Sequence, residues 1–360
     1  MYFQEGLTLE FVHLEGLSMK YSGIAIARFS HSVTVRISRI PAYCIRTSPA
    51  HSSNRSMSSS ATSRLLTADS DDWKPAFIYG TAWKKERTAE LVKLAIQSGF
   101  REVDTAAQPR HYQEHLVGDA LRDVYAESLV TREKMYLQTK YTTPAGQDPK
   151  NMPYDASAPL EDQIRTSVAS SLKNLRPAQD SEEDSYIDCL LLHSPLQTVE
   201  QTLQAWAILE SYVPKKIRSL GISNVSLPVL KAIHENSSIK PAVVQNRFYP
   251  QTRYDAPLRA FCGQHHISYQ SFWTLTGNPH LLQSDPVSQL SHAVQVSRSV
   301  ALYALVMDQG IVVLNGTTSA AHMEEDVSGI RKVRDWAQGH EKDWDGISRG
   351  FSNIIQSTHF

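Results

Sequence analysis

The stretch Glu102-Val103-Asp104-Thr105-Ala106-Ala107 places a carboxylate at the end of an apolar, strand-like run. Two later runs end in a similar way: Tyr136-Leu137-Gln138-Thr139-Lys140 finishes on a lysine, and Cys189-Leu190-Leu191-Leu192-His193 finishes on a histidine. In a barrel of parallel strands, all the carboxyl ends open on one face, where functional residues gather. These runs therefore predict a parallel barrel with charged groups at its mouth.

Short apolar runs alternate with helical patterns from about Phe77 onward, which is typical of βαβ units. Strands are expected near 77–82, 102–106, 135–141, 185–194, 217–223, 242–249, 267–273 and 311–316. Helices are expected near 85–99, 114–127, 159–175, 199–213, 226–238, 255–266, 298–310 and 320–338. Eight such pairs predict an α/β fold, an eight-stranded parallel (β/α)8 TIM barrel.

Three segments are expected along the chain: an N-terminal extension over 1–72, the barrel over 73–340, and a C-terminal tail near the barrel mouth over 341–360. The long loop 141–158, rich in proline, is interpreted as a wall of the substrate pocket.

The N-terminal extension is rich in Ser and Arg and has no Asp or Glu between Leu17 and Ala68. This composition resembles an organelle transit peptide, although the acidic residues nearer the start weaken that interpretation. The alternatives are a disordered arm, or a shorter protein that begins at Met19 or Met57. We therefore expect a cytoplasmic protein, or a mitochondrial one if the extension is a transit peptide.

The bulk composition points away from several classes of protein. The net charge is −1 and the sequence pI is about 6.9, so nothing favours nucleic acid or an anionic membrane as a partner. No apolar run approaches the length of a membrane span. The three cysteines, Cys44, Cys189 and Cys262, are too few for a disulfide framework or a zinc site. A monomer or weak oligomer without a metal is expected.

The strand-end residues, with Tyr112 after the second strand, can form a proton relay. A lysine beside a carboxylate stays charged when buried, and a cation against a tyrosine hydroxyl lowers the pKa of that tyrosine. A neutral histidine can donate a hydrogen bond to a substrate oxygen. Taken singly, Asp104 is more often a turn or helix cap, His193 more often a structural histidine and Lys140 more often a solvated lysine. The spacing alone leaves these interpretations and the catalytic one open. A hydride transfer would require a cofactor.

At this point the sequence resembles the aldo-keto reductases, (β/α)8 barrels that reduce carbonyl compounds with a nicotinamide dinucleotide. The resemblance covers about residues 76–338. It is carried by SGFREVDTA (98–106), VGDAL (117–121), QTK (138–140), YIDCLLLH (186–193), IRSLGISN (217–224) and PAVVQ (241–245). It implies a catalytic set in which Asp104 and Lys140 pair, Tyr112 is the general acid and His193 orients the carbonyl of a small substrate.

The resemblance also implies a cofactor site. Ser223, Asn224 and Gln245 would hold the nicotinamide carboxamide, and Phe272 would stack on the nicotinamide ring, where the family usually has a tyrosine. Trp83 resembles the tryptophan that lines the substrate pocket, although Ala82 is inserted before it.

The loop that carries the tyrosine departs from the family pattern. The usual spacing from Asp104 falls on Pro109, whereas counting back from Val117 falls on His111, so the loop is two residues longer than usual. Tyr112 is the expected proton donor and His111 is the alternative.

The eighth strand departs as well, because Gly316 and His322 stand where NADP-preferring members have a lysine and an arginine. The remaining predicted contacts to the adenine side of the cofactor are Asn315, Thr317, Glu325 and Asp326. NADP(H) is favoured from the family and NAD(H) is possible.

Three functions remain open at the level of sequence. The leading one is an NAD(P)H-dependent reductase of aldehydes or ketones. The second is a catalytically weak, dinucleotide-binding regulatory barrel, which the altered loop permits. The third is a hydrolase or lyase on the same fold, which would need either metal ligands or a Schiff-base lysine such as Lys140. Gln245 and Ser223 argue against the third, because they have no role without a nicotinamide.

Overall fold

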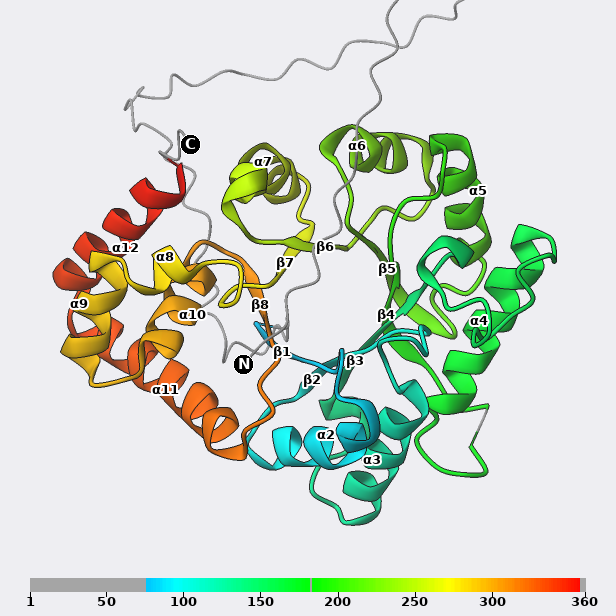
Figure 1. The fold of residues 1–360 in the computed structure, drawn as a ribbon, viewed down its shortest axis with the longest axis horizontal. Coiled ribbons are helices and arrows are strands. Elements are labelled where there is room, and N and C mark those ends of the chain that lie inside the picture. The colour runs from blue at the N-terminus through cyan, green and yellow to red at the C-terminus, as the bar shows by residue number, and fades with distance from the viewer. Residues whose placement is uncertain (1–75, 182, 357–360) are drawn as a thin grey trace, which may run out of the picture. The chain divides into compact units, whose positions relative to one another are not determined.

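The computed structural model describes residues 76–181 and 183–356. Eight parallel strands form a closed barrel in chain order, with β8 paired to β1 (Figure 1). The strands are β1 (Phe77–Gly80), β2 (Glu102–Asp104), β3 (Tyr136–Tyr141), β4 (Ile187–Leu192), β5 (Ile217–Ser223), β6 (Val243–Arg247), β7 (Ser268–Phe272) and β8 (Val312–Asn315). Each overlaps a predicted strand, and the predicted TIM barrel is confirmed. The predicted N-terminal extension and Cys44 lie outside the described residues.

Helices surround the strands (Figure 1). They are α2 (Thr88–Gln97), α3 (Glu114–Ala126), α4 (Leu160–Asn174), α5 (Val199–Glu210), α6 (Leu227–Asn236), α7 (Ala256–Gln264), α8 (Pro279–Leu282), α9 (Asp285–Val294), α10 (Arg298–Asp308), α11 (Ala320–Gly339) and α12 (Glu341–Gln356). The eight predicted helices are all present. The short helices α8 and α9, inserted between β7 and α10, were not predicted from the sequence.

The last described segment forms helix α12, where the sequence analysis expected only a tail. Trp344, Ile347, Phe351 and Ile355 recur at helical spacing and are buried. The helix contacts α9 and α11 in the outer layer (Figure 1). Burial of this apolar stripe explains why the segment is ordered.

The barrel interior changes from apolar to polar along the strands. One buried cluster contains Ile78, Tyr136, Cys189, Val243 and Val312, all in the first half of their strands, together with Leu191 near the carboxyl end of β4. Because side chains alternate along a strand, every second residue of a strand faces the interior. Two residues further along β3 and β6, the same face presents glutamines, Gln138 and Gln245. The polar layer therefore begins in mid-barrel, below the mouth.

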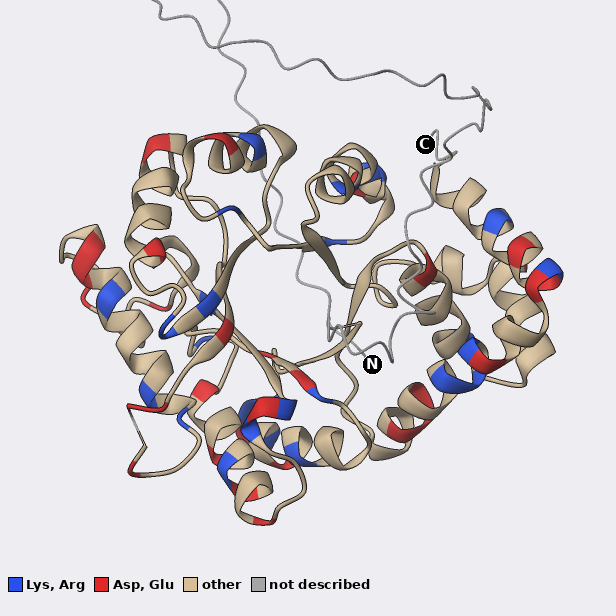
Figure 2. Cartoon of the chain, turned by 180° about the vertical axis from the view of Figure 1, so that it is seen from behind, with Lys and Arg blue, Asp and Glu red and all other residues tan. Residues whose placement is uncertain are grey.

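The charged side chains are spread over the outer surface of the barrel. Figure 2 shows basic and acidic residues side by side on the outer helices, in keeping with the balanced net charge. Within 76–181 and 183–356, no helix is both long and apolar enough to cross a bilayer. In the same ranges, no three His, Cys, Asp or Glu side chains are grouped so that they could hold a metal ion.

Candidate active site at the barrel mouth

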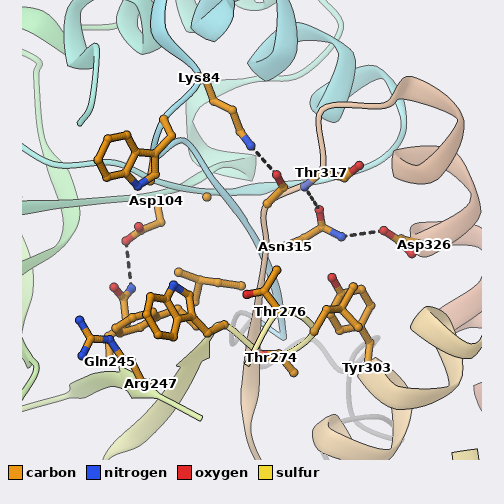
Figure 3. Close-up of a pocket in the computed structure, with 18 of the residues that line it drawn as sticks. Lys84, Asp104, Gln245, Arg247, Thr274, Thr276, Tyr303, Asn315, Thr317 and Asp326 are labelled. Carbon is orange, nitrogen blue, oxygen red and sulfur yellow. Dashed lines mark hydrogen bonds between the residues drawn. The ribbon is translucent and has the colours of Figure 1, made fainter. Parts of the chain in front are cut away.

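A cavity of about 800 Å³ opens where the strands end. Its lining includes all but one of the site residues predicted from the sequence: Trp83, Asp104, His111, Tyr112, His193, Ser223, Asn224, Gln245, Phe272, Asn315, Thr317, Glu325 and Asp326. The exception is Lys140, which is buried against Asp104. Figure 3 shows Asp104 and Gln245 on one side of this cavity and Asn315 and Asp326 on the other.

Asp104 and Lys140 form a buried ion pair at the ends of β2 and β3. Lys140 Nζ lies 2.6 Å from Asp104 Oδ2 and also donates to the carbonyl oxygen of Thr105 at 2.9 Å. The side chains are only 1% and 2% exposed. Burial lowers the pKa of Lys140, while the neighbouring carboxylate of Asp104 opposes this shift.

Tyr112 lies beside this pair. Lys140 Nζ is 5.3 Å from the centroid of the Tyr112 ring. Burial, together with the negative charge of Asp104, raises the pKa of Tyr112. The expected lowering of the Tyr112 pKa is therefore wrong, because burial and the Asp104 charge dominate and Lys140 Nζ donates both of its hydrogen bonds to other oxygens. The phenol is held protonated, which is the form that a proton donor requires.

The extra length of the Tyr112 loop is absorbed by a turn. The backbone N–H groups of His111 and Tyr112 both donate to the carbonyl oxygen of Gln108, at 3.0 and 2.9 Å. Two residues later, the buried Glu114 carboxylate accepts hydrogen bonds from Thr139 of β3 and from α4. This anchor fixes the start of α3 against the barrel and so positions Tyr112 at the cavity.

His111 is turned to a different neighbour. Its ring contacts that of Trp83 at an interplanar angle of 37°, with 3.8 Å between the ring centroids, and its Nδ1 is buried without a partner among the described residues. Trp83 N donates to the carbonyl oxygen of His111 at 2.7 Å, so the two loops are joined. Both residues line the cavity, and the role of proton donor for either Tyr112 or His111 stays a prediction.

His193 follows β4 and faces the ring of Tyr112 edge-on, with centroids 6.0 Å apart. Its Nδ1 is 2.6 Å from the hydroxyl oxygen of Thr142. Burial, with smaller contributions from Lys140 and His111, lowers the pKa of His193 to about 3. The imidazole is therefore neutral at ordinary pH, as the sequence analysis expects. When Thr142 donates to Nδ1, Nε2 carries the proton and can donate to a ligand.

Gln245 belongs to a buried amide network that the sequence analysis did not foresee. Its Nε2 donates to Asp104 Oδ1 at 3.1 Å and to Gln270 Oε1 at 3.0 Å. Gln138 Nε2 donates to the same two atoms, at 2.7 and 2.8 Å. Because an amide nitrogen has two hydrogens, both donors of Gln245 are used, and only its Oε1 is left for a ligand.

Asn224, like Gln245, uses both amide hydrogens within the protein and leaves its amide oxygen for a ligand. Its Nδ2 donates to the carbonyl oxygen of His193 at 2.9 Å and to Ser223 Oγ at 3.2 Å. Its backbone has φ 53°, in the left-handed region that asparagine tolerates. Ser223 Oγ in turn donates to the carbonyl oxygen of Gln245 at 2.7 Å. Asn224 and Gln245 therefore both offer an amide oxygen, which suits an NH2 group on the ligand.

The other side of the cavity is built from β8 and α11. Asn315 Nδ2 donates to Asp326 Oδ2 at 2.7 Å, and Thr317 N donates to Asn315 Oδ1 at 2.9 Å. Burial raises the pKa of Asp326 to about 6. Lys84, which follows β1, donates from Nζ to the carbonyl oxygen of Gly316. Figure 3 shows this lysine above the Asn315–Thr317 segment.

Several residues at this site were not predicted from the sequence. Lys84 and Arg247 line the cavity just after β1 and at the end of β6, so the strand-end rule that found Asp104 could have found them. Gln138 and Gln270 gave no such signal, because mid-strand glutamines have no distinctive pattern.

The predicted pocket wall at 141–158 is wrong, because none of these residues lines the cavity. The loop folds back on itself and on the Tyr112 loop instead. Gln147 Nε2 donates to the carbonyl oxygen of Ala107 at 2.8 Å, and Tyr154 OH donates to that of Thr142 at 2.5 Å.

A profile described as the Aldo/keto reductase family matches residues 74–296. The chain belongs to the aldo/keto reductase family. This aldo/keto reductase is 26% identical over 268 residues to aldo-keto reductase AKR2E4 of Bombyx mori, covering 69% of this chain and 80% of that protein. It is 27% identical over 267 residues to an NAD/NADP-dependent indole-3-acetaldehyde reductase of Schizosaccharomyces pombe, covering 70% and 84%.

Solved structures share the fold of this aldo/keto reductase. The crystal structure of Bombyx mori AKR2E4 in complex with NADP matches with a TM-score of 0.57 at 21% identity, over 73% of this chain and 89% of that one. The polar groups of the cavity fit such a cofactor. The amide oxygens of Asn224 and Gln245 can accept hydrogen bonds, and Figure 3 shows Gln245 on one side of the cavity and Asn315 and Asp326 on the other.

Proposed function

We propose that the protein reduces an aldehyde or ketone to an alcohol, with NADPH as the favoured cofactor. One observation carries the proposal: a protonated Tyr112, a neutral His193 and the Asp104–Lys140 pair line or adjoin one cavity. A nicotinamide, when bound, supplies the hydride that none of these side chains can supply.

In the proposed reaction, Tyr112 donates its phenolic proton to the carbonyl oxygen of the substrate as charge develops there. His193 Nε2 donates a hydrogen bond to the same oxygen and orients the carbonyl. Lys140 holds Asp104 in place and contributes positive charge beside Tyr112, which stabilises the phenolate left behind.

The proposed cofactor contacts follow from the same cavity. The amide oxygens of Asn224 and Gln245 would accept from the carboxamide NH2, and Phe272, which also lines the cavity, would stack on the ring. NADPH is favoured because similar structures are complexes with NADP or NADPH. NADH remains an alternative, in line with the name of the Schizosaccharomyces pombe relative.

The test is NADPH oxidation with benzaldehyde by wild type, Tyr112→Phe and His111→Ala. We expect Tyr112→Phe to lower kcat roughly 10²–10⁴-fold, with unchanged binding of NADP+, because only the proton donor is lost. We expect a much smaller loss for His111→Ala. The reverse order would transfer the role to His111.

Two other results would overturn the proposal. Cofactor binding without turnover of any aldehyde or ketone by the wild type would support the regulatory barrel. Borohydride trapping of a substrate on Lys140 would support the lyase.

A further inference from the structure

Arg247 is a cation at the cavity for which the proposed reaction has no use. It ends β6, lines the cavity and is exposed. Its guanidinium carbon lies 4.7 Å from the centroid of the Trp273 ring and 5.8 Å from that of Phe272. Within 76–181 and 183–356, its side chain makes no hydrogen bond or ion pair, so the guanidinium N–H groups are available to a ligand.

The strand geometry places Arg247 next to the proposed reaction centre. It lies two residues after Gln245 on the same face of β6, and a strand rises about 3.3 Å per residue. Arg247 therefore stands roughly 7 Å further toward solvent than Gln245, whose amide contacts Asp104. Figure 3 shows Asp104, Gln245 and Arg247 on the same side of the cavity, opposite Asn315 and Asp326.

The other full charges that line the cavity have partners or lie elsewhere. Asp104 is paired with Lys140, and Lys84 donates to the carbonyl oxygen of Gly316. Glu325 and Asp326 belong to α11, and Figure 3 shows Asp326 on the opposite side of the cavity. On the side of the described cavity that holds Asp104 and Gln245, Arg247 is thus the charged side chain without a partner, and it carries a positive charge.

The surroundings of Arg247 are aromatic. Trp273 and Trp83 both line the cavity, are 51% and 65% exposed, and have left-handed backbones with φ 61° and 63°. Such a conformation is costly for a bulky residue, so the fold constrains both residues at the mouth. A guanidinium held near an aromatic ring by cation–π attraction still has N–H groups to donate to an anion.

We propose that Arg247 binds the carboxylate of the substrate, so that the protein selects oxo acids with an aromatic or apolar body between the carbonyl and the acid. This inference rests on the proposed function and names its substrate class. A planar guanidinium binds a carboxylate through two parallel hydrogen bonds, whereas an ester offers it no charge. The alternative anion for Arg247 is a phosphate of the cofactor. Measuring the Kd of NADP+ in Arg247→Met distinguishes a cofactor phosphate from a substrate carboxylate.

The kinetic test compares 4-carboxybenzaldehyde with its uncharged analogue, methyl 4-formylbenzoate. We expect wild type to favour the acid about tenfold in kcat/KM, mainly through KM, as for a charge-assisted hydrogen bond. Arg247→Met should abolish this preference without changing kcat/KM for the ester, and Arg247→Lys should restore part of it. Arg349→Met, on the exposed face of α12, is the matched charge control and should keep the preference.

A binding test keeps the inference separate from the proposed function. Terephthalate and its diamide are titrated into the NADP+ complex while tryptophan fluorescence is recorded. We expect terephthalate to bind about tenfold tighter than the diamide, and Arg247→Met to remove that difference. Equal binding of the two ligands by wild type overturns the inference even if aldehydes are reduced. A weaker Kd for NADP+ in Arg247→Met also overturns it, because the anion would then be a cofactor phosphate.

Discussion

Gln138 and Gln270 exchange two hydrogen bonds, of 2.8 and 2.9 Å, across the barrel interior. Gln270 Oε1 also accepts from Gln245 Nε2, and Gln138 Nε2 also donates to Asp104. All three glutamines and Asp104 are buried. The pair therefore fixes which end of the Gln245 amide can meet a ligand, although neither Gln138 nor Gln270 lines the cavity.

Replacement of Gln270 by Met tests whether this amide network contributes to stability, to NADP+ binding, or to both. It leaves donors of Gln138 and Gln245 unpaired in the interior, so we expect a loss of about 3 kcal/mol in the free energy of unfolding. Because the Gln245 amide is then held by Asp104 alone, we expect the Kd of NADP+ to rise several-fold. Urea unfolding and fluorescence titration with NADP+ measure the two effects.

Gln270→Glu is the matched control. A protonated carboxyl at this position can accept from both amides and donate to Gln138 Oε1, and burial beside Asp104 keeps it protonated. We expect a near wild-type Kd for NADP+ at pH 6. Since the pKa of the new acid is raised above its unfolded value of about 4.3, stability should fall as pH rises above that value. An unchanged Kd in Gln270→Met would show that the network serves stability alone.

The lowered pKa of His193 predicts a pH-dependent stability. The folded protein keeps this imidazole neutral down to about pH 3, whereas the unfolded chain protonates it near the ordinary histidine pKa of 6.5. The unfolded state therefore binds more protons in this window, and stability falls as pH decreases below about 6.5. The contribution is about 2 kcal/mol between pH 7 and pH 5.

His193→Asn should remove this contribution while retaining a side chain that can bond to Thr142. We expect wild type to lose about 2 kcal/mol more than the variant when urea unfolding is moved from pH 7 to pH 5. Equal losses would mean that His193 is already protonated in the folded protein at pH 5. Comparison of the two proteins cancels the effects of the other histidines.

His322 should be the position at which cofactor preference can be strengthened. It lines the cavity on α11, is exposed, and stands where the resemblance to NADP-preferring reductases places an arginine. We expect His322→Arg to raise the ratio of kcat/KM for NADPH to that for NADH about tenfold, because arginine pairs with the 2′-phosphate. Gln338→Arg, near the other end of α11, controls for added charge. If His322→Arg instead raises kcat/KM for NADH relative to NADPH, the 2′-phosphate does not bind beside position 322.

The sequence predicts the barrel and most of the cavity lining because both depend on strand ends. The change from apolar residues to a histidine in Cys189-Leu190-Leu191-Leu192-His193 indicates where a buried strand ends. A parallel barrel brings all such carboxyl ends to one face. The residues Asp104, His193 and Asn315, far apart in the chain, could thus be assigned to one site.

What the sequence could not supply depends on how side chains meet across the barrel. The contact between Gln138 and Gln270 spans 132 residues and requires the strand register. The pKa of Tyr112 was predicted in the wrong direction because it depends on burial and on which oxygens Lys140 bonds. Likewise, α9 begins with Asp285-Pro286 inside a segment that resembles a loop. Its apolar face is buried by contact with α10 and α12, which the sequence pattern does not reveal.

Gly118 should be intolerant of any side chain, because the backbone of α3 lies against the last residue of α4 there. A Cβ at this position would lie 1.8 Å from the carbonyl oxygen of Asn174. That carbonyl accepts from Arg122 at 3.1 Å, and the Asn174 amide donates to Glu114 at 3.1 Å. Gly118→Ala must therefore push the two helices apart and loosen the anchor of the Tyr112 loop.

We expect Gly118→Ala to lower the free energy of unfolding by roughly 3 kcal/mol and to lower kcat more than binding of NADP+. Gly263→Ala in α7 is the matched control, since a Cβ there meets nothing within 4 Å. That change should stabilise by about 0.5–1 kcal/mol, through the higher helix propensity of alanine. Equal stability of the two variants would show that α3 can shift without cost, and the Glu114 anchor would then not position Tyr112.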